Sequence, residues 1–291
     1  MKKVILISVF IFQSLLISAQ EKVQIKLTEP SPSASFEQEI GSTIIKVAYN
    51  RPLARGRKIF GELIPFNELW RTGASACTTF ETNETIDFGN STLEAGKYSI
   101  YTIPSKNEWT IIVNKDTTLH GTTGYDEKKD VFRFTVPVEK TANFYETFTI
   151  EVNDIDSKGA GFLKLMWENT MVKIAIKSKA DENILALIEK EIVIKKTQNA
   201  NLLFQAANYY YSTNRDVNKG IQWLNEAEKI DATNFNYPSL RQKIYVGLQD
   251  YPNAIQAAKT ALAIAERKKM KVAESLKKQI GEWELAVKNK K

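Results

Sequence analysis

The segment GKYSIYTIPSKNEWTIIV, residues 96–113, predicts the fold of the first half of the chain. Tyr98, Ile100 and Thr102 alternate with their neighbours, and the same period of two returns over residues 109–113. This period is typical of a strand with one buried face, and the stretch 104–107 between the two runs is rich in turn-forming residues. The segment therefore predicts an antiparallel β-hairpin.

The same period recurs on both sides of this hairpin. Further strands are expected at residues 44–49, 78–81, 131–136, 145–152, 162–167 and 171–176. Glycine-containing turns separate them, and no helical pattern lies between them. Eight or more short strands without helices predict an all-β antiparallel sandwich or jelly-roll-like domain over residues 33–178.

After residue 181 the apolar period becomes that of a helix, and a self-comparison shows a repeat. At a shift of 34 residues, Gly220 falls on Ala254 and Ala227 falls on Ala261. Small residues at this spacing are typical of tetratricopeptide repeats, which are helix–turn–helix units. The sequence therefore predicts an α-helical tetratricopeptide-like repeat domain over residues 181–291, with a final helix at about 269–287 that covers its open end.

The connection between the two predicted domains is polar, because residues 177–182 read Lys-Ser-Lys-Ala-Asp-Glu. Such a stretch is typical of an exposed linker. We expect trypsin to cut the chain there and to release the two domains.

The N-terminus has the pattern of a secretory signal. Lys2 and Lys3 precede an apolar run at residues 4–17, which is followed by small residues. The pattern predicts a signal peptide at 1–19 and a linker at 20–32, and the run is too short for a comfortable transmembrane helix. We therefore expect an exported protein, periplasmic or extracellular, without a transmembrane segment. Its single cysteine, Cys77, excludes an internal disulfide.

The formal net charge is +6, and the basic excess lies in the second half of the chain. An excess of this size on helices indicates a solvated face. No nucleic-acid partner is expected. A protein or peptide partner is expected on the concave surface that helical repeats present.

Several motifs in fixed order resemble one known family. The series comprises Tyr49-x-Arg51-Pro52, residues 56–61 (GRKIFG), residues 69–74 (LWRTGA), residues 95–104 (AGKYSIYTIP) and residues 124–126 (GYD). This series resembles the family called domain of unknown function 2911, over about residues 31–176. The resemblance implies an exported bacterial protein, and it implies no established activity.

Residues 50–79 form an Arg-rich segment that is too irregular for a helix or a regular strand. Candidate ligand-binding residues are gathered there: Arg51, Arg55, Arg57, Lys58, Trp70 and Arg71. Guanidinium groups bind carboxylate or phosphate in bidentate fashion, so these residues could hold an anionic small molecule or a glycan. Alternatively, the same side chains brace the segment against the sheet through backbone carbonyls. We expect bracing above all from Arg71, and less from Arg57.

Sequence motifs for catalysis are absent, and so are those for phosphate or dinucleotide binding. The chain has one cysteine, Cys77, and one histidine, His120, so its composition allows a single thiol–imidazole dyad. No cofactor and no metal are expected. The leading hypothesis is an exported two-domain binding or scaffolding protein. The alternative is a hydrolase acting on cell-envelope glycans or their esters. The two carboxylates that such an enzyme needs can lie far apart in the sequence, where they form no recognisable motif.

Overall fold

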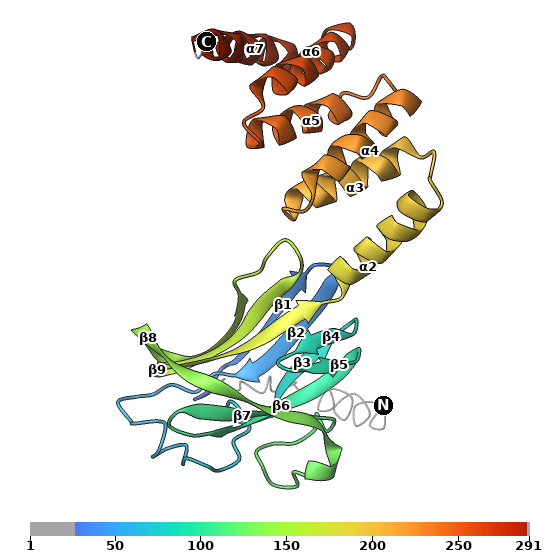
Figure 1. The fold of residues 1–291 in the computed structure, drawn as a ribbon. Helices are drawn as coiled ribbons and strands as arrows, with labels where there is room; N and C mark the ends of the chain where they lie inside the picture. The colour runs from blue at the N-terminus through green and yellow to red at the C-terminus, as the bar shows by residue number, and fades with distance from the viewer. Residues whose placement is uncertain (1–26, 290–291) are drawn as a thin grey trace, which may run out of the picture.

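The computed structural model describes residues 27–289, and Figure 1 shows a sheet followed by a series of helices. The predicted signal peptide and the first part of the predicted linker lie outside the described residues. No helix between residues 27 and 289 is both long enough and apolar enough to cross a membrane. The two-part prediction is confirmed at this level, since an antiparallel sheet precedes the helices.

Nine antiparallel strands make up the sheet of the described chain. They are β1 (Ser33–Ile40), β2 (Thr43–Asn50), β3 (Thr78–Thr82), β4 (Ile86–Phe88), β5 (Ser91–Leu93), β6 (Gly96–Pro104), β7 (Glu108–Asn114), β8 (Asp130–Asn153) and β9 (Ala160–Ser178). Their order in the sheet is β1-β2-β3-β6-β7-β8-β9-β4-β5. The predicted hairpin is β6–β7, with Pro104 paired to Trp109 next to the turn.

Strands β8 and β9 fold the sheet over on itself. The first part of β8 pairs with β7, from Asp130 to Pro137, and its second part pairs with β9, from Val138 to Asn153. The C-terminal end of β9 then pairs with β4. The alternation of apolar residues predicts two strands within β8 and two within β9. Each pair is one long strand, because register shifts between Lys140 and Thr149 let β8 bend without ending.

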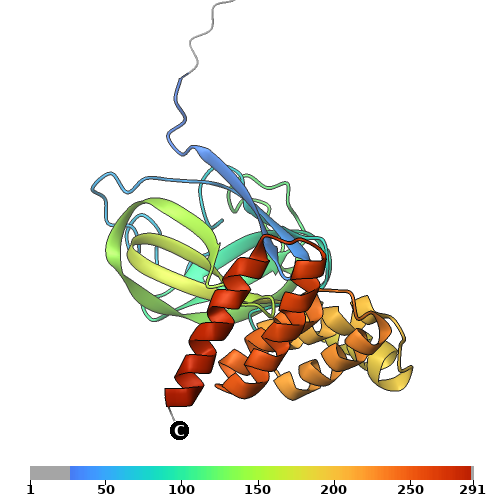
Figure 2. The same cartoon turned by 90° about the horizontal axis from the view of Figure 1, so that it is seen from above.

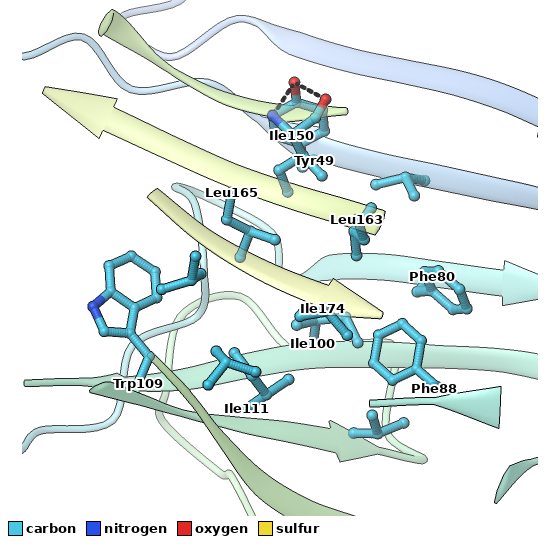
Figure 3. Packing of buried hydrophobic residues seen from close by; sticks show 14 of the residues in the cluster. Tyr49, Phe80, Phe88, Ile100, Trp109, Ile111, Ile150, Leu163, Leu165 and Ile174 are labelled. Atoms are coloured by element: carbon cyan, nitrogen blue, oxygen red, sulfur yellow. Dashed lines mark hydrogen bonds between the residues drawn. The ribbon is translucent and has the colours of Figure 1, made fainter. Parts of the chain in front are cut away.

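The core lies between the two layers that this bend creates. Fully buried side chains of β3, β6 and β7 face those of β4 and β9, as Figure 3 shows, among them Phe80, Ile100, Ile111, Phe88, Leu165 and Ile174. Burying each such side chain contributes about 1.5–3 kcal/mol. Tyr49 joins the layers: its hydroxyl accepts from the Ile150 N–H at 2.9 Å and donates to the Ile150 carbonyl at 3.2 Å.

The second half is helical. It contains α2 (Ala180–Ile188), the π-helix η3 (Glu189–Ile194), α3 (Ala200–Ser212), α4 (Val217–Ile230), α5 (Asn236–Gly247), α6 (Tyr251–Arg267) and α7 (Val272–Asn289). Three helices begin at side-chain caps, because Asn199, Asp216 and Asp250 accept hydrogen bonds from backbone N–H groups of the first turn. Helices α3 and α4 pack together, as do α5 and α6, and α7 lies beside α6, as Figure 2 shows from above.

The junction between sheet and helices is short. Strand β9 ends at Ser178, which is fully buried, and α2 begins at Ala180. The Lys179 ammonium lies 2.7 Å from Asp87 of β4, and the Lys177 ammonium lies 2.9 Å from Glu182 of α2. Both lysines beside the connection are therefore paired with carboxylates. The connection differs in this respect from the exposed linker that its polar composition predicts.

Asp181 fastens α2 to the helices that follow. Its carboxylate accepts two hydrogen bonds from Nη2 of Arg215, at 2.6 and 2.7 Å, and one from the hydroxyl of Tyr209. The Arg215 guanidinium also lies over the Tyr209 ring, 5.4 Å from its centroid. A charge-assisted pair that is this shielded from water fixes the direction in which α3 and α4 leave α2.

Candidate functional site

The start of the Arg-rich segment is bound to the edge of β8. Where β8 leaves β7, its backbone groups on that side need new partners. The Ala54 N–H donates to the Glu146 carbonyl at 2.7 Å, and the Phe148 N–H donates to the Pro52 carbonyl at 2.9 Å. Arg51 adds its side chain, with Nε 3.1 Å from the Phe148 carbonyl and Nη2 2.9 Å from Thr149 Oγ1. Arg51 is therefore a brace.

The next three basic residues of the segment are exposed. Arg55 donates from Nη2 to the Pro30 carbonyl at 2.9 Å. Arg57 donates to the Ala54 carbonyl at 3.0 Å and to the Leu53 carbonyl at 2.7 Å, so it holds its own turn together. Lys58 forms an exposed ion pair with Glu62 at 3.1 Å.

Trp70 anchors the far end of the segment in an aromatic cluster. It is buried, it stacks on Trp167 with ring centroids 6.0 Å apart, and it meets Phe60, Trp109 and Phe148 edge to face. Its indole N–H donates to the Gly73 carbonyl at 3.0 Å. Edge-to-face and offset aromatic pairs stabilise by about 0.5–1.5 kcal/mol beyond their area. Trp70 therefore fixes the backbone on which Arg71 lies.

The turn after Trp70 is strained. Thr72 is β-branched and fully buried, yet its φ is 56°, and Ser75 follows with a φ of 55°. Hydrogen bonds hold this geometry: Thr72 Oγ1 bonds Thr102 Oγ1 at 3.1 Å, and Thr78 Oγ1 donates to the Thr72 carbonyl at 2.5 Å. Strained backbone persists only where surrounding contacts determine it, and such positions gather at ligand sites.

A cavity of about 410 Å³ lies between the two ends of the Arg-rich segment. Apolar side chains form most of its wall: Pro30, Pro52, Leu53, Leu63, Ile64, Pro65, Leu69, Trp70, Ala74 and Trp167. Its charged lining residues are Arg55, Arg57, Arg71 and Glu68. Three guanidinium groups and one carboxylate give this cavity a positive balance.

Arg71 is the half-buried cation of the cavity, and its side chain has no hydrogen-bonding or ion-pair partner among residues 27–289. Its Nε is shielded from solvent without a hydrogen bond. Across the described chain, its side chain forms no hydrogen bond and no ion pair. A Cβ added to Gly121, where φ is 91°, would lie 3.0 Å from Arg71 Nη1, so the glycine leaves room for the guanidinium. Arg71 was expected to brace the segment more than Arg57, and the structure shows the reverse. The Arg57 side chain donates to backbone carbonyls, whereas the Arg71 side chain binds no residue of the described chain.

The structure brings four of the six candidate residues together: Arg55, Arg57, Trp70 and Arg71 surround the cavity. Arg51 is bound to β8 outside it. Lys58 lines a different cavity of about 460 Å³, together with Lys106, Lys140 and Phe144. The sequence pattern did not reveal Thr122 and Trp167, which line the first cavity from distant parts of the chain and leave no local motif. Glu68, which lines it from within the Arg-rich segment, was not among the candidate residues.

Cys77 and His120 do not form a dyad. Cys77 is buried against Tyr101 and Ile112, while His120 is exposed and only its backbone pairs with Ala76. Burial raises the pKa of the Cys77 thiol, which opposes the thiolate that a nucleophile requires. Burial likewise raises the pKa of Tyr101 to about 12, and its hydroxyl donates to the Gly121 carbonyl at 3.2 Å.

The charged side chains of the turn at residues 116–133 form hydrogen bonds and ion pairs with one another. Asp130 accepts from the Tyr125 hydroxyl at 2.7 Å and from Arg133 Nε at 2.6 Å. Hydrogen bonds from Lys129 and Thr118 lower the pKa of Asp116 to about 2. Residues 27–289 contain no group of three or more His, Cys, Asp or Glu side chains placed to hold a metal ion. These acids are therefore structural groups of the loop.

One family model matches the chain, over residues 31–176, and its description is "Protein of unknown function (DUF2911)". The chain belongs to this family. The matched residues include strands β1 to β8, all but the last two residues of β9, the Arg-rich segment and most of the cavity lining, and they end before α2. No curated protein and no solved structure matches the chain.

Proposed function

We propose that the chain is an exported, non-catalytic binding protein. Its sheet holds a small ligand in the cavity beside the Arg-rich segment, and its helices hold a protein partner. The observation that carries the proposal is the cavity itself: a hollow in which many apolar side chains lie beside three guanidinium groups and a single carboxylate. Largely pre-formed apolar hollows with a few placed polar groups are typical of small-molecule sites.

The rigidity of the cavity supports a binding role. The stacked pair Trp70 and Trp167 lines it, and the backbone of Pro52 and Ala54 is hydrogen-bonded to β8. A site that is already ordered loses little conformational entropy when a ligand enters. The strained turn at Thr72 is consistent with this view, because it positions Arg71 without a hydrogen bond from the Arg71 side chain.

The helical half supports a partner-binding role through its packing. Gly220 and Ala227 of α4 are buried, and so are Ala254 and Ala261 of α6, which are their counterparts at the 34-residue shift. A Cβ on Gly220 would lie 3.4 Å from the Ala207 carbonyl of α3, so the two helices approach closely there. This packing favours a tetratricopeptide-like module, and such modules present extended surfaces to partner proteins.

Hydrolysis of envelope glycans fits the cavity less well. Glycoside hydrolysis needs two carboxyl groups across the scissile bond, and Glu68 is the one carboxylate among the residues that line this cavity. Neither Cys77 nor His120 belongs to the lining, so a nucleophile with an imidazole base is not at hand. The residues that line the cavity therefore favour binding over turnover.

Blocking the cavity tests the proposal. The chain without residues 1–19 is screened by thermal shift against a library of charged and neutral small molecules. The screen is repeated with Ala74→Phe, which fills the cavity, and with Ala142→Phe, which adds the same ring at an exposed site of β8. We expect hits with the wild type and Ala142→Phe that Ala74→Phe loses. Hits that survive Ala74→Phe contradict the proposal.

An activity screen tests the hydrolase alternative. The same protein is incubated with glycosides, esters and phosphoesters, and we expect no turnover. Robust turnover that is lost when Glu68 is changed to Gln would replace the binding proposal with a hydrolytic one.

A further inference from the structure

We infer that the cavity takes a small organic anion, with one carboxylate or phosphate group on Arg71 and an apolar body against Trp70 and Ile64. This inference rests on the binding function proposed above and names its ligand class. It starts from the guanidinium of Arg71, whose buried Nε has no hydrogen-bond acceptor in the described part of the chain.

The hydrogen bonding of the Arg71 guanidinium is incomplete within the described chain. A guanidinium presents five N–H donors in a planar fork, and Arg71 uses none of them on a residue of the described chain. Its Nε is shielded from solvent, and water therefore does not accept a hydrogen bond from this donor. A buried donor without an acceptor is unfavourable, and a bidentate oxyanion supplies both the acceptors and the opposite charge.

The other basic residues of the cavity act differently. Arg55 and Arg57 are exposed, and each already donates to backbone carbonyls. Their charge still favours an approaching anion, since the carbonyl partners carry no net charge. Glu68 is exposed at the same cavity and forms no ion pair with Arg71. The positive charge of Arg71 is therefore not neutralised by Glu68 and is available to a ligand.

The walls determine the rest of the ligand. The apolar lining includes Trp70, Trp167, Leu53, Ile64 and Pro65, and the hydroxyl-bearing lining residues are Ser31 and Thr122. A sugar ring needs hydrogen-bonding partners for most of its hydroxyl groups, whereas more than half of the residues in this lining are apolar. An alkyl or aryl body matches them, and a cavity of about 410 Å³ is in the range of small-molecule sites, roughly 300–1,000 Å³.

Matched probes test the inference. Calorimetric titrations of the chain without residues 1–19 use 4-phenylbutanoate, phenyl phosphate, inorganic phosphate and the neutral analogue 4-phenylbutanamide. We expect 4-phenylbutanoate or phenyl phosphate to bind at least tenfold more tightly than the amide and than inorganic phosphate. The better of the two organic probes then shows which head group the site prefers.

Charge-matched variants locate the anion. Arg71→Met keeps an unbranched stem as far as the position of Nε and removes the guanidinium charge, and Lys106→Met removes one exposed charge outside this cavity. We expect at least a tenfold loss of affinity for the organic anion with Arg71→Met and less than a twofold change with Lys106→Met. A variant Arg71→Lys, which keeps the charge without the planar fork, is expected to fall between them.

The outcomes separate this inference from the proposed function. Equal affinity for 4-phenylbutanoate and its amide, or equal effects of Arg71→Met and Lys106→Met, overturns the anion site. So does the failure of both organic anions to bind. The binding function itself still stands if neutral compounds bind the wild type and are lost with Ala74→Phe.

Discussion

Arg51 and Arg71 belong to the same segment and have opposite surroundings. Arg51 completes the edge of β8, where its guanidinium bonds the Phe148 carbonyl and Thr149 Oγ1. Arg71 lines the cavity with its donors unused. Residue type does not distinguish them, because both are arginines in a stretch rich in glycine and proline. The distinction arises from which strand edge each side chain reaches.

Removing the Arg51 side chain should destabilise the protein. Arg51→Met keeps the apolar stem and leaves the half-buried acceptors of Phe148 and Thr149 without their donor. We expect the free energy of unfolding to fall by about 1–3 kcal/mol, measured by urea denaturation. Lys106→Met is the control, since that exposed side chain should change stability by less than about 0.5 kcal/mol. An equal, negligible change in both variants would contradict the bracing role.

At the scale of elements, sequence periodicity predicted the central strands and missed three others. β6 and β7 have a face of large apolar residues, so their alternation is visible. β4 and β5 have three residues each, which is too few for a period. β1 alternates exposed with half-buried residues at the edge of the sheet, so its pattern is mostly polar. The bend of β8 was missed because a register shift has no composition of its own.

The β4–β5 turn depends on Gly89. Its φ is 64°, and an added Cβ would lie 2.3 Å from the Phe134 ring, which is held in the core by Phe88 and Phe132. Gly56 has a similar φ of 71° and open space around it. Gly56→Ala should cost about 1–2 kcal/mol from backbone strain alone. Gly89→Ala should cost a further 1–3 kcal/mol or so from the steric clash, measured by urea denaturation. Equal losses would mean that Phe134 moves aside freely.

The helix crossings depend on small residues. Ala254 is fully buried on α6, while Gln256 on the same helix is exposed. Ala254→Leu should overpack the crossing and lower the free energy of unfolding by about 1–3 kcal/mol, monitored by circular dichroism of the helices. Gln256→Leu adds the same side chain at an exposed position and should change stability by less than about 0.5 kcal/mol. Similar effects in both would mean that the 34-residue match is a coincidence.

For the whole molecule, the junction decides whether the two halves move independently. Its polar composition predicts an exposed linker, but the structure places Ser178 in the interior and engages both neighbouring lysines. The sequence could not reveal this, because Asp87 lies far away in the chain. Periodicity therefore locates the change from strand to helix, and only the tertiary contacts show that the connection is held.

Limited trypsin digestion tests the junction. Cleavage after Lys177 or Lys179 requires an extended, accessible backbone, and Ser178 between them is fully buried. We expect the native chain to resist cutting there, and Asp87→Asn, which removes the charge of the nearer carboxylate partner of Lys179, to speed the cut several-fold. Rapid cleavage of the wild type into a sheet fragment and a helical fragment would show that the halves are loosely joined.

The division of roles along the Arg-rich segment is tested most directly by the stability of Arg71→Met without any ligand. A guanidinium that waits for an anion adds nothing to the free protein, and function is often retained at the expense of stability. We predict that the free energy of unfolding of Arg71→Met, measured by urea denaturation, equals or exceeds that of the wild type. A loss of about 1–3 kcal/mol, the size expected for Arg51→Met, would show that Arg71 is a brace and would contradict the ligand site.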